Sequence, residues 1–207
     1  MTETNRSITF RQLLLDRNTL LVSGFGLIPA LLLAVDSVSG ATTGVLILLI
    51  TLTVYIFASL TRRFLSGFGA ILVYLVAASA LSSLAALLIM KTDLGYYERF
   101  APFLLLIGIC PVCITGAFLY GRSELPRSVY NACAAGFGYG LAVTVYGILR
   151  ELLAEGSLCG VSLFKGIGFF STAAGAIVLL ACLCALFKAI INKANEYEDD
   201  VIEQEKD

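Results

Sequence analysis

Long apolar stretches alternate with short polar connections along most of the 207-residue chain. A helix rises about 1.5 Å per residue, so a stretch of about 20 apolar residues crosses the roughly 30 Å of hydrocarbon in a bilayer. Six stretches approach or exceed that length: 19–35, 42–60, 68–90, 101–120, 131–153 and 167–190. The pattern therefore predicts an all-α integral membrane protein with six transmembrane helices.

Polar segments flank the apolar region at both ends of the chain. Residues 1–18 contain three arginines and precede the first apolar stretch directly, an order that signal peptides share. Because the first stretch is long and five more follow it, we expect it to be retained as a membrane helix. The pattern predicts an N-terminal segment at 1–18, a single membrane domain at 19–192 and an acidic tail at 193–207.

The distribution of basic residues predicts the orientation in the membrane. With six helices, both ends of the chain lie on one side, together with the connections after the second and fourth helices. These segments carry ten of the fourteen Lys and Arg residues. Because cytoplasmic segments are enriched in Lys and Arg, we expect both termini in the cytoplasm.

A short motif occurs twice, 82 residues apart, in the first and fourth stretches. Gly26 and Pro29 enclose Leu-Ile in the first copy, and Gly108 and Pro111 enclose Ile-Cys in the second. Each half of the chain has three stretches, an odd number, so the second half enters the membrane from the opposite side. The sequence thus predicts a 3+3 inverted repeat with broken helices 1 and 4.

Each proline removes a backbone donor and is expected to free the carbonyl four residues earlier, that of Phe25 or Ile107. Discontinuous helices near the middle of the membrane commonly bind the transported ion or substrate. We therefore assign the four motif residues to the helix breaks and the ion path. The alternative is a pair of ordinary proline kinks that neighbouring helices accommodate.

Composition narrows the possible chemistry. Hydrophobic residues make up 58% of the chain, charged residues 14%, and the net charge of −1 argues against a basic surface for nucleic acid. The chain has no His, which excludes an imidazole base, most zinc sites and His-ligated haem. Acidic residues fall at the ends of the stretches or between them, so we identify no buried carboxylate relay and no catalytic residue.

Two motifs carry possible chemistry. Cys110 and Cys113 form a C-x-x-C pair that is typical of a redox dithiol or of half a thiolate metal site. The alternative is that both are buried apolar cysteines. Arg150 and Glu151 end the fifth stretch, where they are either a charge pair at the membrane interface or part of an ion-access site.

Three segments resemble the Rnf-Nqr family, whose members include membrane components of the Rnf electron transport complex and of the sodium-translocating NADH:quinone reductase. NTLLVSGFGLIP at 18–29 is similar to the family pattern N-x-x-L-V-x-x-L-G-L-C-P. PVCITGAFLYGR at 111–122 is similar to P-L-I-V-T-N-C-x-x-x-G-R. GILRELLAEGSLCG at 147–160, with Arg150, Glu151 and Gly156, is similar to G-x-L-R-E-I-x-G-x-G-T-L-x-G.

The resemblance implies a membrane subunit of a redox-driven, ion-translocating complex in the bacterial cytoplasmic membrane. Such a subunit contributes to the electron or ion path and to assembly, and it is not an enzyme by itself. Its partners would be a homologous subunit of opposite orientation and the other subunits of the complex. In the family, one Cys from each broken helix of each of the two subunits holds a shared [2Fe–2S] cluster.

This sequence departs from the family at the cluster positions. Ile28 and Ala117 occupy the places of the two family cysteines. Cys110 and Cys113 lie about two turns and one turn before Ala117, so a displaced half-site is one interpretation. A second interpretation is a stand-alone or dimeric six-span transporter that has lost redox chemistry.

Overall fold

A computed structural model describes residues 26–158 and 161–204, which are almost entirely helical. The helices are α1 (Leu27–Leu33), α2 (Ser37–Thr61), α3 (Gly67–Thr92), α4 (Leu94–Leu104), α5 (Pro111–Gly116), α6 (Leu125–Glu155) and α7 (Ala173–Gln204). The only sheet in this part of the chain is a hairpin of two short strands, β1 (Ser157–Leu158) and β2 (Val161–Ser162).

Within the described residues, five helical segments are long and apolar enough to cross a membrane. They are Ser37–Thr61, Gly67–Thr92, Leu94–Gly121, Leu125–Glu155 and Ala173–Lys193. These five segments confirm the second to sixth predicted helices. Residues 19–25 of the first predicted stretch, 19–35, lie outside the described residues, and the described part, 26–35, contains the short helix α1.

The helices extend beyond the apolar stretches because local signals set their ends. Asp36 caps α2 in a reciprocal arrangement: its side chain accepts a hydrogen bond from the Ser39 N–H (2.8 Å), and Ser39 Oγ accepts one from the Asp36 N–H (3.1 Å). At the other end of the chain, α7 continues past residue 193, the predicted start of the acidic tail.

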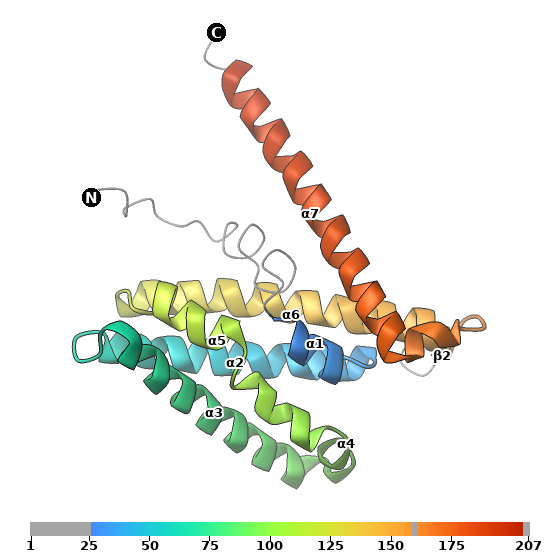
Figure 1. Cartoon of the computed structure of the whole chain (residues 1–207), viewed down its shortest axis with the longest axis horizontal. Coiled ribbons are helices and arrows are strands. Elements are labelled where there is room, and N and C mark those ends of the chain that lie inside the picture. The colour runs from blue at the N-terminus through green and yellow to red at the C-terminus, as the bar shows by residue number, and fades with distance from the viewer. Residues whose placement is uncertain (1–25, 159–160, 205–207) are drawn as a thin grey trace.

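Helices α2 and α6 lie side by side and form the long axis of the molecule (Figure 1). Glycines make the close contact possible. A Cβ atom on Gly44 would lie 2.7 Å from the Gly140 carbonyl oxygen, and one on Gly147 would lie 2.7 Å from the Asp36 carbonyl oxygen. Small residues at this contact fit the packing of membrane helices, where lipid supplies no hydrophobic force between them.

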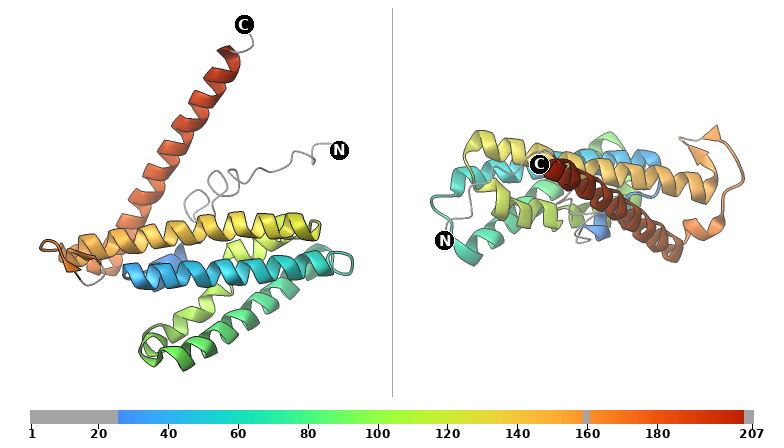
Figure 2. Two further views of the ribbon diagram at one scale, coloured as in Figure 1. Left: turned by 180° about the vertical axis from the view of Figure 1, so that it is seen from behind. Right: turned by 90° about the horizontal axis from the view of Figure 1, so that it is seen from above.

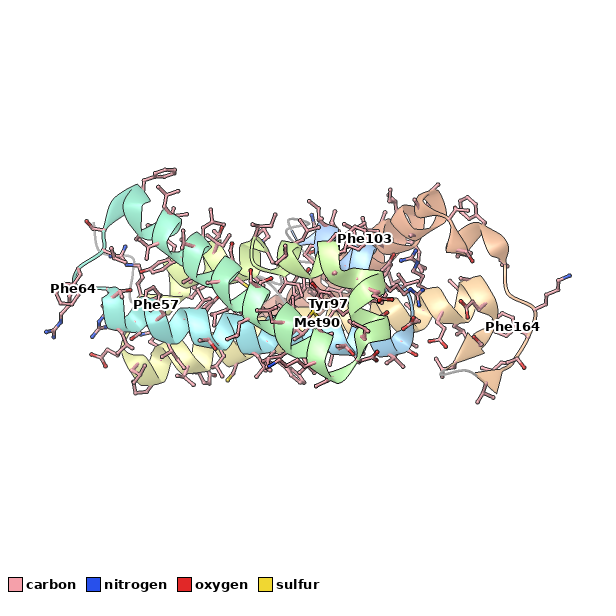
Figure 3. All side chains as sticks on the ribbon, turned by 90° about the horizontal axis from the view of Figure 1, so that it is seen from below. Phe57, Phe64, Met90, Tyr97, Phe103 and Phe164 are labelled. Carbon is pink, nitrogen blue, oxygen red and sulfur yellow. The ribbon has the colours of Figure 1, made fainter. Side chains whose placement is uncertain are left out.

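The fourth span, α4 to α5, packs between α3 and the α2–α6 pair, and α7 leaves the bundle at a steep angle (Figures 1 and 2). The α2–α3 turn with Phe64 lies at one end, and the loop with Phe164 lies at the other (Figure 3). Arg122 Nη2 donates to the Leu65 carbonyl oxygen (2.6 Å), so the connections after the second and fourth predicted helices meet at one end.

Candidate functional site

The fourth span is interrupted before Pro111. Helix α4 runs into a 3₁₀ turn at Leu105–Ile107, and α5 begins at Pro111. Between them, Cys110 has an extended backbone, with φ −62° and ψ 130°. In the structure the fourth span therefore consists of two helical pieces that meet at Cys110.

One detail of the predicted helix break is wrong. The Ile107 carbonyl was expected to be free, but it accepts a hydrogen bond from the Cys110 N–H at 3.1 Å. The chain tightens here into i→i+3 bonds, and the Gly108 N–H bonds to the Leu105 carbonyl oxygen in the same way. Gly108 allows the break to lie against α3, because a Cβ atom on it would be 2.7 Å from Ser79 Cα.

The first copy of the motif also opens a helix. Gly26 precedes the first residue of α1, and Pro29 lies in its first turn. Phe25, whose carbonyl was also expected to be free, lies outside the described residues. Pro29 and Pro111 thus occupy the first turns of short helices, positions where the missing N–H of proline costs little.

Tyr139, in the middle of α6, lies between the two motif copies. Its hydroxyl donates to the Gly26 carbonyl oxygen at 2.5 Å, and its side chain interacts with the thiol of Cys110. A Cβ atom on Gly26 would overlap Tyr139 Cε2, so only glycine leaves room for the ring. Nothing in the sequence marks Tyr139 as part of a site, because it lies in a glycine-rich segment and its partner Gly26 is 113 residues away.

Cys110 and Cys113 are 1% and 0% exposed. The thiol of Cys113 lies 3.4 Å from Thr51 Oγ1 on α2, and that of Cys110 interacts with Tyr139 on α6. Both thiols therefore contact helices of their own chain. Neither thiol lies on the surface of the described bundle.

These residues do not fit a [2Fe–2S] cluster. Ile28 and Ala117 offer no ligand atom, and Ala117 is fully buried. No group of three or more Cys, Asp or Glu side chains able to hold a metal ion occurs in the described part of the chain. A displaced half-site would have to present both cysteines to a partner, whereas their thiols lie inside the bundle.

Arg150 and Glu151 bind the two helix ends that meet at the α1–α2 turn. Arg150 Nη1 donates to the carbonyl oxygens of Leu31 (3.0 Å) and Ala34 (3.3 Å) at the end of α1. Glu151 Oε2 accepts from the N–H (2.8 Å) and the hydroxyl of Ser37 at the start of α2. A cation at a helix C-terminus and an anion at an N-terminus both complement the helix dipole, so the pair fixes this turn.

Gly156 ends α6 in the left-handed conformation, with φ +68°. Its N–H bonds to the Leu152 carbonyl oxygen at 3.0 Å, and its own carbonyl accepts from Leu163 and Phe164 in the following loop. A Cβ atom here would overlap the Phe164 carbonyl oxygen. Gly156 is thus a structural glycine that reverses the chain after α6.

A polar cavity of about 490 Å³ lies beside the α1–α2 turn. Its walls come from the first turns of α2 and α4 and the last turn of α6, and they include Asp36, Tyr96, Arg99 and Glu151. Arg99 Nη1 lies 3.8 Å from Asp36 Oδ2 across it. The cavity is thus charged, open and located at the end of the bundle opposite the α2–α3 turn.

Comparison with known proteins supports the same family. The family profile described as "Rnf-Nqr subunit, membrane protein" matches residues 7–184. The E component of a proton-translocating ferredoxin:NAD(+) oxidoreductase complex from Clostridium ljungdahlii is 22% identical over 156 residues, which cover 75% of this chain and 73% of that protein. The E component of an ion-translocating oxidoreductase complex from Shewanella sp. W3-18-1 is 30% identical over 145 residues, 67% of this chain and 60% of that protein.

Proposed function

Because the chain belongs to the Rnf-Nqr family of membrane subunits, we propose that it is a membrane subunit of an ion-translocating oxidoreductase complex of the Rnf type. The family match over residues 7–184 carries this proposal. The reaction would be the one named for the clostridial relative, electron transfer between ferredoxin and NAD(+) coupled to ion translocation.

We infer a six-span, 3+3 inverted-repeat arrangement with both termini in the cytoplasm of the bacterial cell. Pro29 and Pro111 open short helices in the two halves, and Tyr139 contacts the start of each one. This symmetry supports an inverted repeat whose two broken helices meet inside the bundle. The basic connections at the end that contains Arg122 support a cytoplasmic position for that end.

Within the complex, this subunit contributes to the ion path and to assembly. Its side chains do not fit the cluster of the family, so we assign it no electron carrier of its own. Its partners would be a homologous subunit of opposite orientation and the remaining subunits of the complex. Apolar side chains such as Leu72, Val76 and Leu88 on α3 are about half exposed or more, so they are available to lipid or to such subunits.

A second function, a stand-alone six-span transporter, is favoured by one observation: Ile28 and Ala117 stand where the family has thiolates. Loss of both cysteine ligands would remove the iron–sulfur cluster and its redox chemistry, while the broken helices would remain.

Co-purification from the native organism separates the two functions. The chain is tagged at its C-terminus, extracted in a mild detergent and analysed by mass spectrometry, with an equally tagged unrelated multi-pass protein as the control. We expect the other membrane and peripheral subunits of an Rnf-type complex to be enriched with the chain and not with the control. Isolation of the chain alone or as a homo-oligomer would contradict the proposal.

A further inference from the structure

Helix α2 carries a row of buried polar side chains along its length. They follow an i, i+4 ridge that only one apolar residue interrupts: Ser39, Thr43, Ile47, Thr51, Tyr55 and Ser59. No side chain in this row is more than 6% exposed. Burying hydroxyl groups in a membrane helix costs free energy unless they find partners, so a row of this length calls for an explanation.

The ridge follows the interrupted fourth span from one end to the other. The contacts along α2 are Thr43 with Tyr96, Thr51 with the Cys113 thiol (3.4 Å), Tyr55 with the Val112 carbonyl oxygen (3.2 Å) and, just beyond the span, Ser59 with the Ser123 carbonyl oxygen (2.8 Å). Ile47 falls between the contacts at Tyr96 and Val112, in the stretch that contains the helix break. The polar ridge therefore lies against the discontinuous helix and avoids the lipid-facing side of α2.

Two oxygens at one end of the ridge lack hydrogen bonds. Thr43 Oγ1 and Tyr96 Oη are buried atoms without a hydrogen-bond partner in the described structure, and Thr43 is 0% exposed. The two hydroxyls interact with each other, and neither makes a hydrogen bond to a third group among the described residues. Both oxygens are thus available to coordinate an ion that prefers oxygen ligands.

The polar cavity opens at this same end, because Tyr96 lines it. Its walls carry four acidic residues, Asp36, Asp93, Glu151 and Glu155, and one basic residue, Arg99. An excess of negative charge in a concave site raises the local concentration of cations. Thr43 lies one helical turn along α2 from Ser39, which also lines the cavity.

We propose that the buried ridge of α2 and the facing fourth span form a path for a monovalent cation, sodium or the proton. The acidic cavity is its entry, Thr43 and Tyr96 are its first binding positions, and Ile47 is its apolar barrier. Hydroxyl and carbonyl oxygens replace the hydration shell of such an ion, and an apolar constriction prevents leakage. The inference rests on the proposed function, since it specifies where the complex moves its ion.

The test uses the assembled complex in inverted membrane vesicles. Thr43→Val and Thr51→Val each remove a ridge hydroxyl at nearly constant volume. Thr42→Val and Thr53→Val are matched controls on the same helix, because those hydroxyls bond only to their own helix, at the Val38 and Leu49 carbonyls (both 2.9 Å). Uptake is measured with ²²Na⁺ and, in parallel, with a dye that reports proton uptake.

We expect cation uptake to fall by about tenfold in the two ridge variants, a loss of the size expected for one hydroxyl contact to a charged group. The two controls should keep the wild-type rate. If the ridge variants transport as well as the controls, the inference is wrong, although the proposed function stands. If wild-type vesicles with and without the chain take up the ion equally, the proposed function itself fails.

A second variant keeps the inference testable if a ridge variant does not assemble. Ile47→Ser places a hydroxyl at the one apolar position of the ridge, and Leu49→Ser on the exposed side of α2 is its control. We expect Ile47→Ser to raise the passive leak of ²²Na⁺ or protons in the absence of electron donors, and Leu49→Ser to leave the leak unchanged. An unchanged leak in Ile47→Ser would overturn the assignment of Ile47 as the barrier.

Discussion

Replacing Arg150 with leucine is expected to destabilise the membrane domain by about 3 kcal/mol, because hydrogen bonds to a charged group are worth about 1.5–3 kcal/mol each. Arg150 is 8% exposed and donates to the carbonyl oxygens of Leu31 and Ala34. Leucine would leave both carbonyls buried without a donor and would release the end of α1. In a domain of this size, that loss lowers the melting temperature by roughly 6–12 °C.

The measurement is thermal unfolding of the purified protein in detergent, monitored as the fraction of protein that remains monodisperse. Arg127→Leu is the control, because Arg127 is an exposed residue of the same helix and should change the melting temperature little. Arg150→Lys should fall between the two, since lysine keeps the charge but lacks the planar fork of donors. Equal melting temperatures for Arg150→Leu and Arg127→Leu would show that the α1–α2 turn does not depend on this contact.

Replacing Gly108 with valine is expected to be the most damaging change at the helix break. A Cβ atom there would lie 2.7 Å from Ser79 Cα and 3.0 Å from the Ala78 carbonyl oxygen, and both are backbone atoms that cannot rotate away. Overpacking a close contact typically costs about 1–3 kcal/mol, and a rigid backbone neighbour pushes the cost to the upper end. The break and α3 would separate, so we expect both a lower melting temperature and reduced co-purification of partner subunits.

Gly95→Val in the same span provides the control for this experiment. A Cβ atom on Gly95 would meet only the Asp93 carboxylate, at 3.5 Å, an ordinary contact. The difference between the two variants then isolates the contact with α3 from the general effect of replacing a glycine in this span with valine. If Gly108→Val unfolds and assembles like Gly95→Val, the break does not require close contact with α3.

Sequence reasoning predicted the helices well where the signal is local. The second to sixth apolar stretches correspond to the five spanning segments. In lipid, a single apolar segment satisfies its backbone hydrogen bonds best as a helix. The interruption before Pro111 was also predictable, since proline cannot continue the hydrogen-bond ladder. The prediction of a free Ile107 carbonyl was wrong because the backbone forms i→i+3 hydrogen bonds there in place of i→i+4 bonds. The presence of proline does not determine which of the two forms.

The features that the sequence did not predict depend on contacts between residues that are far apart in the chain. The hydroxyl of Tyr139 and the carbonyl of Gly26 are 113 residues apart, and Arg150 reaches Leu31 across 119 residues. No periodicity within one helix signals such pairs. The motif around Arg150 could be recognised by resemblance, yet its interpretation as a charge pair or an ion-access site did not foresee that each side chain binds a different helix end.

The polar residues of the α2 ridge recur at four-residue spacing in the sequence. The sequence alone does not show that their side chains are buried. Thr42 and Thr53 are as polar as Thr43 and Thr51, and only the packing of the fourth span distinguishes the two sets. One sequence alone thus could not separate hydroxyls that face lipid from hydroxyls that face the interrupted helix.

The central claim, that this chain is a subunit of an ion-translocating oxidoreductase complex, is tested most directly by deleting its gene and restoring it on a plasmid. Inverted membrane vesicles from each strain receive reduced ferredoxin and NAD(+), and NADH formation is followed together with uptake of ²²Na⁺ and of protons. We predict that coupled ion uptake disappears in the deletion strain and returns with the wild-type gene. Full coupled uptake in vesicles that lack the chain would contradict the account.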